Sequence, residues 1–262
     1  MLGLSFCLGA HAAEELLAAA RSGDAVTALE LLRDGNPATS VGNDGTSVLH
    51  WAVLHEADDL IDELLAAGAD PKATNRYGIT PLYLAAQNGS ATAIERLLDA
   101  GADPNEVGTE GETVLMTVTR SGNVAAARKL LEAGADVAAK EQWHGQTAMM
   151  WAAGYGQPEM ITLLAEFDAD VNAISNIVEW ERQVTSEPRA KWLPPGGMTP
   201  LLFAAREGCV ECIPVLAELG ADVSQTTPDG ISGIVSALIN GHYDAAAALI
   251  SVGTDPNLTD YT

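Results

Sequence analysis

Residues 80–111 contain two short runs of apolar residues at helical spacing. The first run opens with Thr80, a candidate N-cap, and with Pro81, whose missing N–H costs nothing at the first helical position, and it ends at Gly89. The second run, over about residues 90–100, has its apolar positions on one helical face: Ile94, Leu97 and Leu98. Asp, Pro, Asn and Gly then punctuate residues 103–111, which predicts a turn or short hairpin. The pattern therefore predicts helix, turn, helix and a projecting finger.

This unit repeats along the chain with a nearly fixed period. Gly45, Gly78 and Gly111 are 33 residues apart, and Gly145 follows after 34. A second marker, an Ala-Asp or Thr-Asp pair whose first residues are 69, 102, 135, 169, 221 and 254, gives spacings of 33, 33, 34, 52 and 33. Two independent markers with one spacing indicate a repeat protein.

The repeated motifs resemble those of the ankyrin repeat family. Thr80-Pro81-Leu82 and Thr199-Pro200-Leu201 match the family's opening motif, and Gly134-Ala135-Asp136-Val137 and Gly220-Ala221-Asp222-Val223 match its closing motif. Other units drift, as in Ser47-Val48-Leu49-His50, which keeps the His and loses the Pro. The resemblance implies a mainly α fold, an ankyrin-repeat α-solenoid of stacked helix-turn-helix units with short β-hairpin or turn fingers.

The register also predicts how the chain is divided. Residues 13–42 are expected to form an N-terminal capping helix pair, residues 43–257 six ankyrin repeats, and residues 258–262 the start of a further repeat. The 52-residue spacing predicts an inserted loop at about residues 174–195. The final helix pair is apolar on most sides, which is unlike a polar cap and indicates either a longer array or self-association through this repeat.

The first twelve residues are expected to be a signal peptide. Residues 2–12 are apolar and end in Ala10-His11-Ala12, which fits a signal-peptidase site, although no basic residue precedes Arg21, so the leader is expected to be truncated. This predicts a bacterial, exported protein that is periplasmic or secreted. If the segment merely extends the first helix, the protein is cytoplasmic.

Charge narrows the classes of partner. Thirteen basic against 36 acidic residues give a net charge of −23, which disfavours nucleic acid and anionic lipid. Beyond the leader, no stretch approaches the roughly 20 apolar residues of a spanning helix. With 47% hydrophobic residues, the chain is expected to fold.

The ankyrin resemblance implies recognition of a protein partner through the concave face. The positions that vary in the family flank the finger glycine and the end of the first helix. Tyr, Trp and Arg dominate interface hot spots, so the candidate contacts at those positions are Arg76, Tyr77, Arg120, Trp143, His144, Tyr155 and Arg206. The alternative for Trp143 is that it only covers its neighbouring finger.

The inserted loop contrasts with the acidic body. It holds two of the five tryptophans and three of the thirteen basic residues: Trp180, Arg182, Arg189, Lys191 and Trp192. One hypothesis is that these residues contact the partner, and the other is that the loop folds back over the groove. A further alternative is a small-ligand site, for example for a sugar, in which Trp180 and Trp192 act with Trp143 or Tyr155.

Candidate chemistry is sparse. In the run Cys209-Val210-Glu211-Cys212, the two cysteines are interpreted as small core residues. The alternatives are a redox-active segment and, if the chain is exported, an oxidised pair. No catalytic, metal-binding or cofactor motif accompanies it, so we expect no enzyme, no metal and no cofactor. His50 stands at the family's His position, where the resemblance implies a structural hydrogen bond between fingers and helices.

Overall fold

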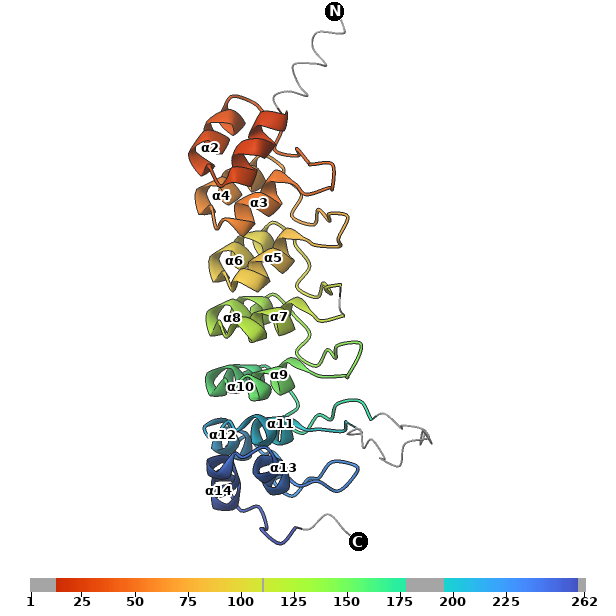
Figure 1. Cartoon of the computed structure of the whole chain (residues 1–262). Coiled ribbons are helices and arrows are strands. Elements are labelled where there is room, and N and C mark those ends of the chain that lie inside the picture. The colour runs from red at the N-terminus through yellow and green to blue at the C-terminus, as the bar shows by residue number, and fades with distance from the viewer. Residues whose placement is uncertain (1–12, 110, 178–195, 259–262) are drawn as a thin grey trace, which may run out of the picture. The chain divides into compact units, whose positions relative to one another are not determined.

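The computed structural model describes residues 13–109, 111–177 and 196–258 (Figure 1). It divides into two compact units, Met1–Asp136 and Val137–Thr262. The described residues are mainly helical, with short fingers between the helix pairs, so the predicted fold class is confirmed. The expected signal peptide and the inserted residues Trp180, Arg182, Arg189, Lys191 and Trp192 lie outside the described residues.

The first unit consists of two layers of short helices. Residues 13–22 are helical, and the helices after them are α2 (Ala25–Arg33), α3 (Val48–Leu54), α4 (Asp58–Ala66), α5 (Pro81–Asn88), α6 (Ala91–Asp99), α7 (Val114–Ser121) and α8 (Val124–Glu132). The first helices of successive pairs pack together, α3 on α5 and α5 on α7. The second helices form the other layer, with α2, α4, α6 and α8 in order.

The second unit repeats this arrangement. Its helices are α9 (Ala148–Gly154), α10 (Pro158–Glu166), α11 (Pro200–Glu207), α12 (Cys212–Glu218), α13 (Gly233–Ile239) and α14 (Tyr243–Ser251). α9, α11 and α13 pack in one layer, and α10, α12 and α14 in the other. The proposed boundaries of the cap and of the six repeats stay a prediction.

Helix α5 begins and ends where local chemistry predicts. Thr80 is the N-cap of α5, its hydroxyl accepting a hydrogen bond from the Tyr83 N–H at 3.0 Å, and Pro81 is the first helical residue. Gly89 ends the helix in the left-handed conformation, with φ at 68°, which a residue without a Cβ adopts at no steric cost. The predicted N-cap, first helical residue and terminating glycine of this helix are therefore confirmed.

The core lies between the two layers of each unit. Ile94 and Leu97 of α6 are fully buried, as their helical spacing predicts, and Leu82 of α5 is buried beside them in the same unit. In the second unit, Ile161 and Leu164 of α10 have the same role. Each such side chain contributes about 1.5–3 kcal/mol through removal of apolar surface from water.

Single antiparallel bridges join the two sides of some of the fingers. In the first unit these join Val41 to Ser47 and Val107 to Thr113, and in the second unit Ile177 to Gly196 and Thr226 to Ser232. None of the described helices is long and apolar enough to cross a membrane.

Candidate functional site

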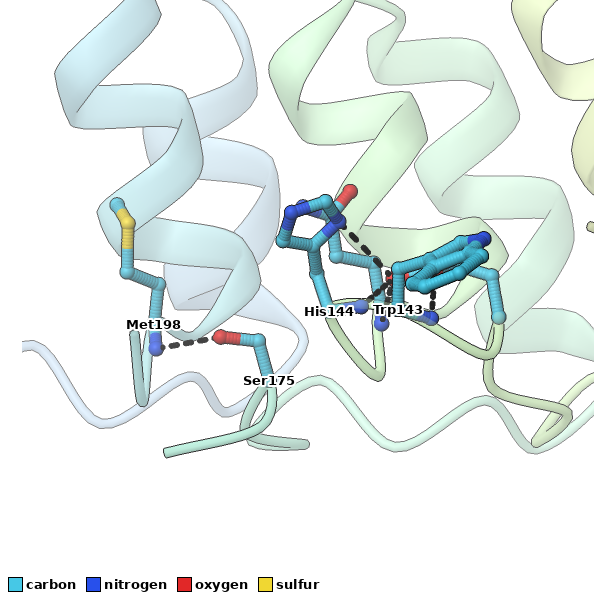
Figure 2. Close-up of polar contacts among 6 residues, drawn as sticks. Trp143, His144, Ser175 and Met198 are labelled. Carbon is cyan, nitrogen blue, oxygen red and sulfur yellow. Dashed lines mark hydrogen bonds and ion pairs between the residues drawn. The ribbon is translucent and has the colours of Figure 1, made fainter. Parts of the chain in front are cut away.

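In the finger formed by residues 141–147 of the second unit, one carboxylate binds three backbone N–H groups of the turn. The buried carboxylate of Glu141 accepts hydrogen bonds from the backbone N–H groups of Trp143 at 2.6 Å, His144 at 2.7 Å and Gln146 at 3.0 Å (Figure 2). Charge-assisted bonds of this kind are stronger than neutral ones. The Trp143 side chain itself is 69% exposed. We call this segment the Trp143 finger.

The finger built on Asn75 shows how this arrangement arises. Asn75 Oδ1 accepts the N–H groups of Tyr77 at 2.9 Å and Ile79 at 3.0 Å. The Trp143 finger has one residue more before its glycine, as the 34-residue spacing indicated, and the longer Glu141 side chain spans the wider turn. The extra residue lets the turn present both an indole and an imidazole.

The Trp143 finger is joined to the base of the inserted segment. The His144 carbonyl accepts a hydrogen bond from the Asn176 N–H at 2.6 Å. Ser175 and Met198 pair next to it: the Ser175 N–H donates to the Met198 carbonyl at 3.0 Å, and the Met198 N–H donates to Ser175 Oγ at 3.0 Å (Figure 2). The residues on either side of the inserted segment are therefore held together beside this finger.

Two helix ends of the second unit add further candidate residues. Tyr155 caps the end of α9, is 54% exposed, and meets Trp151 edge-on at 6.3 Å between ring centroids. Arg206, in the last turn of α11, places its guanidinium carbon 4.8 Å from the ring centroid of Phe203. It also donates to Glu207 Oε1 at 2.7 Å and to Met198 Sδ at 3.4 Å.

The surfaces of α9 and α11 adjoin. A Cβ placed on Gly154 would lie 3.9 Å from Phe203 Cδ1, and Phe203 is the ring under Arg206. The neighbouring surface contains a hollow of about 400 Å³ that runs from the end of α9 to the start of α12. It is lined by Gly154, Tyr155, Gly156, Glu207, Gly208, Cys209, Val210 and Glu211, and we call it the Tyr155 hollow.

The candidate residues of the first unit are arranged differently. Arg76 lies over the ring of its neighbour Tyr77, at 5.6 Å, and Tyr77 is 61% exposed. A hydrogen bond from the Thr46 backbone and the nearby Arg76 charge lower the pKa of the Asp44 carboxyl in the adjacent finger. Arg120 is exposed in the last turn of α7. No contact among the described residues brings Arg120 to Arg76 or Tyr77.

Sequence reasoning missed several contributors to these surfaces. Trp151 and Phe203 each stand one position after the repeat's His position, so the repeat register could have found them. The sequence gives no such signal for Glu141, because a carboxylate in a finger resembles a solvated charge. This carboxylate can be buried because three backbone N–H groups donate hydrogen bonds to it.

The described residues contain no group of three or more His, Cys, Asp and Glu side chains that could hold a metal ion. Cys209 and Cys212 are joined by a disulfide. Cys212 is fully buried, as expected, whereas Cys209 is only half-buried and lines the Tyr155 hollow.

Comparison with known proteins agrees with this architecture. The family model for ankyrin repeats (3 copies) matches residues 16–108, 82–175 and 180–260, so the chain belongs to the ankyrin repeat family. The crystal structure of the human ASB11 ankyrin repeat domain is similar, with a TM-score of 0.72 and 24% sequence identity over 92% of this chain and 98% of that one. That likeness shows the fold. No curated protein matches the chain significantly.

Membership of this family sets the general function. Ankyrin repeats are generally protein–protein interaction modules, and the family is typically non-enzymatic.

Proposed function

We propose that this chain binds a protein partner through the Trp143 finger and the adjoining ends of α9 and α11, without catalysing a reaction. The observation that carries the proposal is the 69% exposure of Trp143 on a turn fixed by three bonds to buried Glu141. A turn whose backbone is already hydrogen-bonded loses little conformational entropy on binding, and the exposed indole supplies a large apolar area. Tyr155 and Arg206 add the other two side chains that are enriched at interface hot spots.

Charge supports a basic partner. The chain has a net charge of −23, and the basic residues in the described part of the second unit are Lys140 and Arg206. Lys140 donates to the Ile174 carbonyl and Arg206 to Glu207, so both are already engaged. A partner segment with an apolar side chain flanked by Lys or Arg would match this surface and associate faster at low salt.

The inserted segment is proposed to extend the contact. Its ends are held beside the Trp143 finger by the Ser175–Met198 and Asn176–His144 pairs. Trp180, Trp192, Arg182, Arg189 and Lys191 would then contribute aromatic and cationic side chains. A sugar or another small ligand bound through Trp180 and Trp192 stays the alternative, which stoichiometric binding of such a ligand would favour.

The test is affinity capture from native extract with matched baits. The baits are the wild-type chain, a Trp143→Ala/Tyr155→Ala variant and, as a control, Tyr243→Ala, which removes an aromatic side chain that is 71% exposed on α14. We expect one protein to be captured by the wild type and by the control, and to be lost with the double variant. Equal melting temperatures would show that the loss is not due to unfolding. Equal capture by all three baits would refute this contact surface.

A fourth bait separates the contribution of the inserted segment. Since Ile177 and Gly196 form a bridge, residues 178–195 can be replaced by an Asn-Gly turn, which closes a two-residue hairpin. Weaker capture by this bait would assign part of the contact to the insertion. Unchanged capture would limit the contact to the finger and the helix ends.

We also propose export, in a bacterium to the periplasm or the medium. The apolar segment ending in Ala10-His11-Ala12 supports it, and the Cys209–Cys212 disulfide suits an oxidising compartment. Cell fractionation with N-terminal sequencing tests it, and a mature chain beginning at Ala13 is expected. A full-length chain in the cytoplasm would favour the cytoplasmic alternative.

Self-association through the last helix pair is a separate prediction. Leu238, Ile239, Tyr243 and Ile250 are large apolar residues that stay exposed on α13 and α14. Light scattering at high concentration tests it, because a mass of 27.2 kDa would correspond to a monomer and count against it.

A further inference from the structure

Cys209 occupies the place of a helix-capping residue. Ser90 and Asn123, each directly after a repeat glycine, accept the N–H of the residue three positions on: Ala93 at 3.3 Å and Ala126 at 3.0 Å. Cys209 follows Gly208 in the same way, and its sulfur accepts the Cys212 N–H at 3.1 Å. Here the same two residues are also joined covalently. The disulfide thus stands where two other repeats use the side-chain caps Ser90 and Asn123.

The two sulfurs differ in access. Cys212 is the first residue of α12 and is fully buried. Cys209 is half-buried and lines the Tyr155 hollow, and a Cβ on Gly156 across this hollow would lie 3.8 Å from its sulfur. A thiol that enters the hollow therefore meets Cys209 first.

Acidic groups dominate the charge around this sulfur. Glu207 and Glu211 line the hollow, and Arg206 offsets only Glu207, through the 2.7 Å pair. Two other titratable groups face the site. Tyr155 lies at the end of α9, and the His242 ring lies so close to Gly208 that a methyl group added to this glycine would overlap it. Anionic molecules are therefore repelled from the hollow, and cationic ones are attracted.

We propose that Cys209–Cys212 is a thiol-exchange site that accepts neutral or cationic low-mass thiols through Cys209 and excludes anionic ones. This inference goes beyond protein binding, and its test requires no partner.

The exchange takes two steps. The thiolate of an external thiol attacks Cys209 Sγ, a new S–S bond forms, and the Cys209–Cys212 bond breaks with Cys212 leaving as a thiolate that takes a proton from water. A second external thiolate then attacks the external sulfur of the mixed disulfide and releases Cys209 as a thiolate, which is protonated in turn. The protein disulfide is reduced by two electrons, and two external thiols are oxidised to one disulfide.

The first test measures the rate of opening by two thiols of opposite charge. The full chain is incubated with cysteamine or with glutathione at equal thiolate concentration, quenched with an alkylating reagent and analysed peptide by peptide, so that Cys7 is followed separately. We expect cysteamine to open the disulfide at least about threefold faster than glutathione. In 1 M salt, this ratio of the two rates should fall towards the ratio measured on the denatured chain. Glu211→Gln should lower the ratio. Equal rates with both thiols, or a ratio unaffected by salt, would refute the charge selection.

The second test uses the single-cysteine variants and does not depend on the disulfide. Cystamine should form a mixed disulfide with Cys209 in Cys212→Ser at least about tenfold faster than with Cys212 in Cys209→Ser, because thiol exchange requires access to the sulfur. Matching circular dichroism and melting temperatures would verify that both variants are folded. A faster reaction at Cys212, or alkylation of both cysteines in the wild type without any reductant, would overturn the proposal.

Discussion

The hydroxyl of Tyr83 donates a hydrogen bond to the carboxylate of Glu112, and both side chains are buried. The two residues are 29 apart in sequence. His50 contacts the Ile79 carbonyl through Nε2 at 2.9 Å across the same separation. The residue at the family's His position therefore reaches the next finger in both repeats, but His50 meets a backbone carbonyl, whereas Tyr83 meets a side-chain carboxylate.

Removal of the Tyr83 hydroxyl should destabilise the protein. Tyr83→Phe leaves the buried Glu112 carboxylate without this donor, and its other oxygen, Oε2, has no partner among the described residues. We expect a loss of about 1–3 kcal/mol in the free energy of unfolding, measured by urea denaturation. The matched control is Tyr77→Phe, at an exposed position, which should change it by less than about 0.5 kcal/mol. Equal effects of both variants would contradict the role of the buried pair.

Lowering the pH should lower the free energy of unfolding through protonation of His50. Burial lowers the pKa of His50 below its ordinary 6.5, opposed by its bond to the Ile79 carbonyl and by the charge of Asp44. The unfolded chain therefore binds more protons than the folded one in this window. This contribution to stability is complete above the unfolded pKa of about 6.5 and is lost as the pH falls towards the folded pKa.

The comparison is made between the wild type and His50→Gln. The free energy of unfolding of each is measured at pH 7.5, 6.5 and 5.5. The wild type should lose more stability on acidification than the variant, since the remaining histidines are common to both. Parallel pH profiles would show that His50 does not contribute.

The buried carboxylate of the Trp143 finger should be sensitive to loss of its charge. Glu141→Gln replaces one accepting oxygen by an NH₂ group, which would face a backbone N–H instead of accepting from it. We expect a destabilisation of about 1–3 kcal/mol by urea denaturation. Glu159→Gln, at an exposed carboxylate of α10, is the control and should shift stability by less than about 0.5 kcal/mol. An effect no larger than that of the control would mean that the three bonds do not fix the finger.

One asparagine in each unit makes the same pair of hydrogen bonds, and replacing either one should lower the free energy of unfolding by a similar amount. Asn105 donates to the Gly134 carbonyl at 3.1 Å and accepts from the Asp136 N–H at 2.7 Å. Asn172 donates to the Gly220 carbonyl at 3.0 Å and accepts from the Asp222 N–H at 2.8 Å, although the insertion separates it from these residues in sequence. Asn105→Ala and Asn172→Ala should each cost about 0.5–1.5 kcal/mol in unfolding free energy. A negligible cost for Asn172→Ala alone would mean that the insertion disturbs this link.

The local part of the fold could be predicted from the sequence because its causes are local. Thr80 and Pro81 mark a helix start through their own chemistry, and the spacing of Ile94 and Leu97 marks the buried face. The partners of Tyr83 and Glu141 could not be predicted in this way. Tyr83 meets a residue 29 positions away, and Glu141 is satisfied by a turn one residue longer than its counterpart.

The same distinction applies to the candidate site. Trp143 and Tyr155 stand at variable positions of the repeat, and both are exposed in the structure. The pairing of Cys209 with Cys212 could not be assigned from sequence, because C-x-x-C spacing is equally compatible with two core thiols. Whether the candidate residues bind a partner stays a prediction.

The most direct test of protein binding places a photo-cross-linking amino acid at single positions of the second unit. The chosen positions are Trp143 and Tyr155, with Ile250 on α14, which is 49% exposed, as the control. After irradiation in native extract, mass spectrometry should find one adduct of the same partner at positions 143 and 155 and no adduct of that partner at position 250. An absence of adducts at 143 and 155, or equal labelling at all three positions, would contradict a partner-binding surface formed by the Trp143 finger and α9.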